Sequence, residues 1–158
     1  MTLYPSLTSR LSNQHELLTE LIADIPETHV SAELVKGKWS IHDNIAHLAR
    51  YQPVFLDRMH TILSVDEPSF ERYVAEEDPD FPTWQKWDTK YLLERMNEDR
   101  KTISGLIISL SEEKLSRVGI HKKFGRLMIV KWTEFFLLHE AHHAFTIFQL
   151  AQSPAGML

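Results

Sequence analysis

Four long segments with helical periodicity dominate this sequence, and proline or glycine residues lie in the breaks between them. In each segment apolar residues recur every three or four positions, which places them on one face of an α-helix. We predict helices at about residues 6–24, 40–63, 83–110 and 127–152. No segment shows a convincing strand pattern of alternating apolar and polar residues. The sequence therefore predicts one all-α domain over residues 1–158, built as a four-helix bundle.

Local signals support the ends of these helices. Ser40 and Asp43 have the spacing of a capping box, in which a hydroxyl and an acidic side chain close the first turn of a helix. Pro26 ends the first helix, and Pro53 should bend the second because proline lacks a backbone N–H. Residues 64–82 form a long, acidic, proline-containing connection between the second and third helices. Because this connection exceeds the length of a tight turn, we expect it to cross the bundle or cover a cavity.

The sharpest chemical signal is the pentad His139-Glu140-Ala141-His142-His143 in the fourth helix. Residues four apart in a helix differ by about 40° around the axis and about 6 Å along it. His139 and His143 can therefore reach one metal ion. Both lie in an apolar stripe, where an imidazole is costly to bury without a partner. The alternative is an ordinary core histidine bonded to a carbonyl. Since the chain has no cysteine, a transition-metal site must use imidazole and carboxylate ligands.

His47, two turns into the second helix, is the third candidate ligand. On its own it would be interpreted as a solvated or capped histidine, and its pairing with the fourth helix favours a metal site. His42 and His60 lie roughly 140° away on the same helix, so we expect them to face solvent. His142 is about 60° from His139 and is interpreted as a supporting or interface residue. The remaining histidines have no comparable context: His15, His29 and His121.

The pentad also matches H-E-x-x-H, the motif of zincin metalloproteases. The metzincin extension requires a glycine and a histidine where this chain has Thr146 and Gln149. No acidic residue follows His143 to serve as the glutamate ligand of other zincins. A protease also needs a strand edge to align its substrate, and no strand is predicted here. We therefore interpret the match as a coincidence of spacing.

Two stretches of the chain resemble the DinB-like superfamily of DNA-damage-inducible proteins, which includes the YfiT-like proteins. Residues 37–48, GKWSIHDNIAHL, are similar to the tryptophan, helix cap and first metal histidine of that family. Residues 139–143 are similar to its C-terminal histidine pair with an adjacent extra histidine. The resemblance implies that His47, His139 and His143 bind a divalent metal, which agrees with the spacing argument. The resemblance further implies that the protein is a metal-dependent thiol transferase or isomerase, or a hydrolase. It also implies assembly into a homodimer.

Three protein ligands leave at least one coordination position open, as in catalytic metal sites. Zinc, nickel or iron would suit such a nitrogen-rich site. Our first functional expectation is a metal-dependent thiol S-transferase that uses a low-molecular-weight thiol. The alternatives are a hydrolase acting through a metal-bound water and a non-catalytic, metal-binding stress-response dimer. Gln14 and Asp99 interrupt apolar stripes and are candidate catalytic groups lining the cavity, although Asp99 could instead pair with Arg95.

Charge and hydropathy restrict the partners of the protein. A net charge of −5 argues against nucleic acid, which requires a concentrated basic surface. No apolar run approaches the roughly 20 residues that cross a bilayer, and the first residues do not resemble a signal peptide. We therefore expect a cytoplasmic protein that acts on a small molecule. The fourth helix is apolar nearly all round, so either the 64–82 connection covers it or, as we expect, a homodimer forms.

Overall fold

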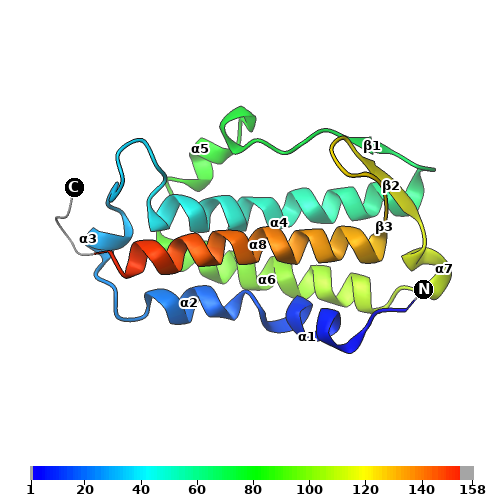
Figure 1. Cartoon of the computed structure of the whole chain (residues 1–158), viewed down its shortest axis with the longest axis horizontal. Helices are drawn as coiled ribbons and strands as arrows, with labels where there is room; N and C mark the ends of the chain where they lie inside the picture. Colours follow the sequence, from blue (N-terminus) through cyan, green and yellow to red (C-terminus); the bar gives the residue numbers. More distant parts are fainter. Residues whose placement is uncertain (1, 154–158) are drawn as a thin grey trace.

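Two long helices, α4 (Ile41–Ser64) and α8 (Ile129–Ala151), lie side by side in the computed structural model, which describes residues 2–153 (Figure 1). A third helix, α6 (Thr89–Ile108), packs against α4. The fourth position is shared by two short helices in succession, α1 (Pro5–Asn13) and α2 (Glu16–Ile22), which pack on α6 and α8. This arrangement confirms the predicted helical bundle. Within the described part of the chain, no helix has both the length and the apolar character to span a membrane.

The first predicted helix, at residues 6–24, is interrupted at Gln14 and His15, where the chain forms a tighter turn. Here the amides of Leu17 and Leu18 bond to carbonyls three residues back, as in a 3₁₀ turn. Both polar side chains bond to neighbouring helices, with His15 Nε2 3.1 Å from Asn97 Oδ1 of α6. The interruption of the apolar stripe therefore coincides with an interruption of the helix.

The third predicted helix is also divided, into α5 (Phe81–Trp84) and α6. Asp88 begins α6 as its N-cap, and its side chain accepts a hydrogen bond of 2.7 Å from the Tyr91 amide. The predicted capping box of α4 is confirmed, with Ser40 and Asp43 bonded reciprocally. The remaining helical turns are short: α3 (Glu27–Val30), η1 (Ala75–Glu77) and α7 (Glu112–Leu115).

A small sheet at one end of the bundle corrects the expectation that the chain has no strand (Figure 1). Strands β2 (Val118–His121) and β3 (Gly125–Met128) form an antiparallel hairpin, and β1 (Ser69–Phe70) pairs parallel to β2. Strands of two to four residues are too short to produce a detectable alternation. Gly119 allows β2 to approach the helices closely, because a Cβ there would lie 2.7 Å from Ile62 Cδ1.

The connection between α4 and α6 runs back along α4 and carries β1, η1 and α5 (Figure 1). Arg50 of α4 forms an ion pair of 2.8 Å with Asp78, and Arg58 Nη2 donates a hydrogen bond of 2.8 Å to the Glu71 carbonyl. Residues 72–76 line a cavity beside α4 and α8. The structure thus confirms that this long connection covers a cavity.

A buried polar layer divides the core into two apolar clusters. Arg100 of α6 and Glu140 of α8 form an ion pair in this layer, and both side chains are almost completely buried. Gln52 accepts a hydrogen bond of 3.1 Å from Arg100 Nε, and Gln14 Nε2 donates one of 3.0 Å to Glu140 Oε1. The layer therefore links all four positions of the bundle by polar contacts.

Candidate metal centre

The three histidines predicted from the sequence lie together between α4 and α8. Each ring offers one nitrogen, and these three atoms all lie within 4.8 Å of one another. His47 Nε2 is 3.0 Å from His139 Nε2. The ring centroids of His139 and His143 are 4.8 Å apart. Because α4 supplies one ring and one turn of α8 supplies two, the helices themselves hold the cluster in place.

The hydrogen-bond partners of these rings fit a divalent transition metal. His143 Nδ1 is 2.8 Å from the side-chain oxygen of Asn44, which can only accept, so this nitrogen donates and Nε2 keeps its lone pair. Asn44 is itself fixed by a 2.8 Å hydrogen bond to the Ser40 carbonyl. Among the described residues, His47 Nδ1 and His139 Nδ1 are buried without a partner. Three converging imidazoles, of which His143 keeps its lone pair on Nε2, form a donor set suited to zinc, nickel or iron.

The environment keeps all three imidazoles neutral. Burial, with a smaller contribution from the charges of His143 and His139, lowers the pKa of His47 to about 2. Burial is also the main cause that lowers the pKa of His139 to about 3 and that of His143 to about 4. A metal binds only the neutral form of imidazole. The protein therefore presents these ligands in the protonation state that metal binding requires.

These pKa values predict that the metal-free protein loses stability in mild acid. In the unfolded chain the same histidines titrate near 6.5, so below that pH the unfolded state binds more protons than the folded state. As the pH falls further, each histidine lowers the free energy of unfolding by up to about 1.4 kcal/mol per pH unit. This decrease ends when the pH reaches the pKa of that histidine in the folded state. Urea denaturation of chelator-treated protein should show a fall of several kcal/mol between about pH 7 and pH 5.

A variant separates this effect from general acid denaturation. His143→Ala removes one of the three groups and should give a shallower dependence of the free energy of unfolding on pH. His60→Ala removes an exposed histidine of α4 and should leave the slope unchanged. Equal slopes in the wild type and His143→Ala would contradict the assignment of neutral, buried imidazoles.

The three rings lie on the wall of a cavity of about 380 Å³. Aromatic side chains surround the cluster: the Trp39 and His47 ring centroids are 5.1 Å apart, and those of Tyr51 and His139 are 4.8 Å apart. The 72–76 segment closes one side. The further lining residues are Arg58, Arg72, Tyr73, Val74, Ala75, Glu76, His121, Phe135 and His142. A small molecule in this cavity would lie directly against the histidine cluster.

The other two candidate residues lie away from this cavity. Gln14 Nε2 donates to the Leu137 carbonyl at 2.8 Å and to Glu140, so its side chain belongs to the polar layer. Asp99 forms the alternative ion pair, with its Oδ2 3.0 Å from Arg95 Nε. Neither residue lines the histidine cavity.

Glu140 also lies away from the three histidines, although it follows His139 directly in the sequence. Its carboxylate is buried against Arg100 and accepts a hydrogen bond from Gln14. In a zincin this glutamate would face the metal as the general base. The pairing of Glu140 with Arg100 therefore supports the interpretation of H-E-x-x-H as a coincidence.

The structure confirms the interpretation of one further histidine, corrects that of a second and places a third at the cavity. His60 is exposed, as predicted. His42 does not face solvent freely, because its ring nitrogens lie 2.9 Å from Thr89 Oγ1 and 2.9 Å from the Gln85 carbonyl. His121, which had no recognised context, lines the histidine cavity from β2.

Sequence reasoning missed Arg58 and Tyr73 as cavity residues. Arg58 lies eleven positions after His47, or about three helical turns, so the two share one face of α4. That spacing was a usable signal for Arg58. Tyr73 belongs to the irregular 64–82 connection, where no periodicity indicates which side chains face the bundle.

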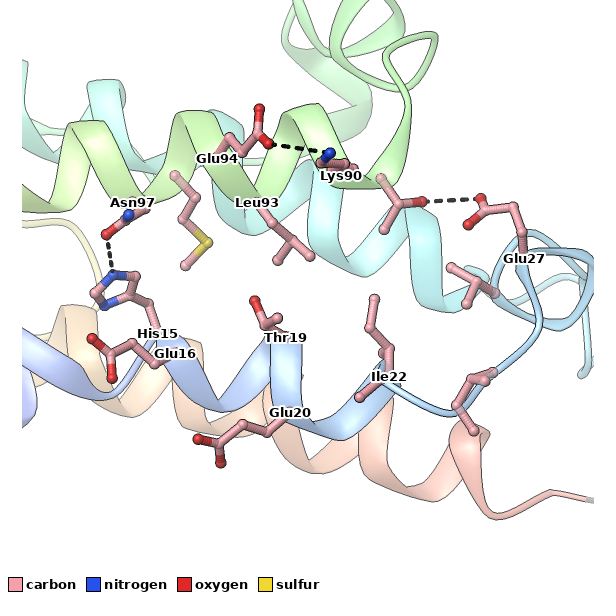
Figure 2. A pocket seen from close by; sticks show the side chains of 15 residues that line it. His15, Glu16, Thr19, Glu20, Ile22, Glu27, Lys90, Leu93, Glu94 and Asn97 are labelled. Atoms are coloured by element: carbon pink, nitrogen blue, oxygen red, sulfur yellow. Dashed lines mark hydrogen bonds and ion pairs between the residues drawn. The ribbon is translucent and has the colours of Figure 1, made fainter.

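A second, larger cavity of about 630 Å³ lies between α2 and α6 (Figure 2). Thr19 and Leu93 line it, and His15 lies at one end beside Asn97. Its rim carries exposed glutamates, and none of the three clustered histidines contributes to it. The larger cavity is therefore separate from the candidate metal centre.

The structure thus defines a helical-bundle protein with a three-histidine cluster on the wall of a cavity. Residues 10–147 match the family model of the DinB superfamily, and the chain belongs to that superfamily. Among solved structures it is similar to YfiT from Bacillus subtilis, described as a probable metal-dependent hydrolase with an unusual four-helix bundle topology. That match has a TM-score of 0.80 and 16% identity, covers 93% of this chain and 85% of YfiT, and supports the fold alone. No curated protein matches the sequence.

Proposed function

We propose that this protein is a metalloenzyme that binds one divalent transition metal through His47, His139 and His143 and transfers a low-molecular-weight thiol to a small electrophile. The observation that carries the proposal is the convergence of three neutral imidazoles on the wall of a cavity. A metal held there would supply Lewis-acid chemistry that lowers the pKa of a thiol or of water. Three protein ligands leave room for such a molecule.

The surrounding side chains orient the ligands and exclude water. Asn44 fixes the ring of His143 through its hydrogen bond. Tyr51 and Tyr73 pack beside His47, and their rings remove solvent from one side of the cluster. The Tyr73 hydroxyl donates a hydrogen bond of 2.8 Å to Asp78 Oδ2, and burial together with this contact raises the pKa of Tyr73. The phenol therefore remains protonated at neutral pH.

The composition of the cavity favours a thiol activated by the metal over a nucleophile that a protein carboxylate must deprotonate. Among the described residues that line it, Glu76 is the single carboxylate, and it is exposed. A nucleophile that depends on a buried carboxylate as general base has none here. A thiol whose pKa is lowered by a metal ionises near neutral pH without such a base. This lining suits direct activation of an external thiol.

Hydrolysis is the second candidate function. The description of YfiT as a probable metal-dependent hydrolase, on a similar fold, favours it. The same lowering of pKa can act on water, and His121 and His142 line the cavity as further polar groups. A non-catalytic metal-binding role in a stress response is the third possibility and predicts bound metal without turnover.

One activity panel distinguishes these functions. The metal-supplemented protein is assayed with bacillithiol, mycothiol or glutathione and an electrophilic dye, and separately with ester and amide substrates in the absence of thiol. We expect thiol-dependent consumption of the dye that is lost in His139→Ala. Ester or amide cleavage without thiol would instead establish the hydrolase, and tightly bound metal with neither activity would support the third role.

We also propose that the protein forms a homodimer through α8. Leu138, Phe145 and Phe148 are 57%, 60% and 45% exposed and lie within about 80° on one face of this helix. Such a face is costly to leave in water. Light scattering at micromolar concentration should give twice the chain mass of 18.5 kDa. Phe145→Asp should shift the protein to the monomer, and a wild-type monomer throughout the range would contradict the dimer.

A further inference from the structure

We propose that Arg58 binds the carboxylate of a small organic anion in the histidine cavity. The inference rests on the proposed function in taking this cavity as the substrate site, and it names the chemical class of the molecule that enters. It makes Arg58 a specificity-determining residue.

Arg58 is a buried cation that lacks an anionic partner. Its side chain lines the cavity, yet the residue is only 9% exposed. Two other arginines of the bundle have a carboxylate partner: the buried Arg100 pairs with Glu140, and the half-buried Arg50 pairs with Asp78. Within residues 2–153 no ion pair involves Arg58. A buried charge ordinarily requires a counter-charge, and no carboxylate of residues 2–153 supplies one to Arg58.

The contacts that Arg58 does make are neutral. Nη1 lies 3.2 Å from the Tyr51 hydroxyl and Nη2 donates to the Glu71 carbonyl. The guanidinium carbon lies 5.6 Å from the Phe70 ring centroid and 5.7 Å from that of Trp132. These contacts fix the orientation of the side chain but use only part of its five N–H donors. The Arg58 side chain therefore has a fixed orientation, and some N–H donors of its guanidinium remain available to a ligand.

The positive field of Arg58 reaches the groups around the cavity. Burial is the main cause that lowers the pKa of His121 on the cavity wall, and the charge of Arg58 lowers it further. Arg72 adds a second positive charge to the lining, and Glu76 is the one negative charge among the described lining residues. This balance favours an anionic molecule in a chain whose net charge is −5.

The geometry of the group indicates a carboxylate. A planar guanidinium presents paired N–H groups that match the two oxygens of a carboxylate. The cavity holds about 380 Å³ and its walls carry Trp39, Tyr73 and Phe135, so an apolar or aromatic body can pack beside the charged end. The preferred ligand is therefore a small organic acid, with its reactive part toward the histidines.

Two probes of equal shape test this proposal. Phenylacetate and phenylacetamide are titrated calorimetrically into the purified, full-length protein, both as isolated and after chelator treatment. We expect the wild type to bind phenylacetate at least about tenfold more tightly than the amide, because only the carboxylate can pair with the guanidinium. Arg58→Gln should reduce this ratio to about one, and Arg58→Lys should reduce it several-fold because an ammonium lacks the planar fork.

Two controls separate the outcomes. Arg95→Gln removes a cation of α6 that does not line this cavity and should preserve the ratio. His139→Ala should lose metal yet keep the preference for phenylacetate, so a failure of the metal site and a failure of the anion site are distinguishable. Equal binding of both probes, no saturable binding of phenylacetate, or loss of the preference in folded His139→Ala would overturn the proposal. Circular dichroism verifies folding; if Arg58→Gln does not fold, an unchanged ratio in Arg58→Lys also overturns it.

Discussion

His139→Ala should reduce the bound metal from about one ion per chain to a small fraction, because two imidazoles cannot replace the three-ligand set. His143→Ala should have the same effect, and both are measured by elemental analysis after supplementation with zinc, nickel or iron. These are the largest functional effects that we expect. The rings lie on one wall of one cavity, so the loss of either leaves the ion with fewer protein ligands.

His60→Ala is the matched control for this experiment. His60 lies on α4 like His47, but it is exposed and outside the cluster. Its removal should leave the metal content unchanged, whereas His47→Ala should lower it. If His60→Ala lost the metal and His47→Ala retained it, the third ligand would be wrong. His42→Ala should also keep the metal, although loss of the contacts to Thr89 and Gln85 should lower stability.

Glu140→Ala should destabilise the protein more than any substitution of a surface charge. It leaves the guanidinium of Arg100 buried without its carboxylate, which typically costs about 3–5 kcal/mol. For a chain of this length, that loss corresponds to a melting temperature about 10 °C lower. Thermal and urea denaturation of chelator-treated protein measure the effect without a contribution from bound metal.

Asp99→Ala provides the comparison, because it also removes the acid of an ion pair on a helix of the bundle. The Arg95 side chain is 42% exposed, so solvent screens this ion pair and the cost should stay below about 1 kcal/mol. Replacing both buried partners, as in Arg100→Met with Glu140→Leu, should recover much of the lost stability. Equal effects of Glu140→Ala and Asp99→Ala would contradict the role of the polar layer in the core.

The helices and the three clustered histidines could be predicted because their signals are local. A repeat of 3.6 residues identifies a helix from one segment, and His139 and His143 share a face by spacing alone. His47 required the additional expectation that α4 and α8 are neighbours, which the bundle supplies. Ser40 and Asp43 close a turn by themselves, so their capping box could also be predicted from the sequence.

The features that could not be predicted depend on contacts between distant segments. The sheet pairs Ser69 with Ile120, about fifty residues apart, through strands too short for a periodic pattern. The stripe of α6 was expected to carry Asp99 in its centre, whereas Arg100 is the residue that enters the core. Only the position of Glu140 on a neighbouring helix explains why a cation can occupy that place.

Anomalous diffraction from crystals of the metal-supplemented protein tests the central claim most directly. The account predicts one strong peak at the absorption edge of the bound metal, located about 2.0–2.2 Å from one ring nitrogen of each of His47, His139 and His143. A map without a peak in the histidine cavity, or with the ion bound at other residues, would contradict the assignment of this cluster as the metal centre.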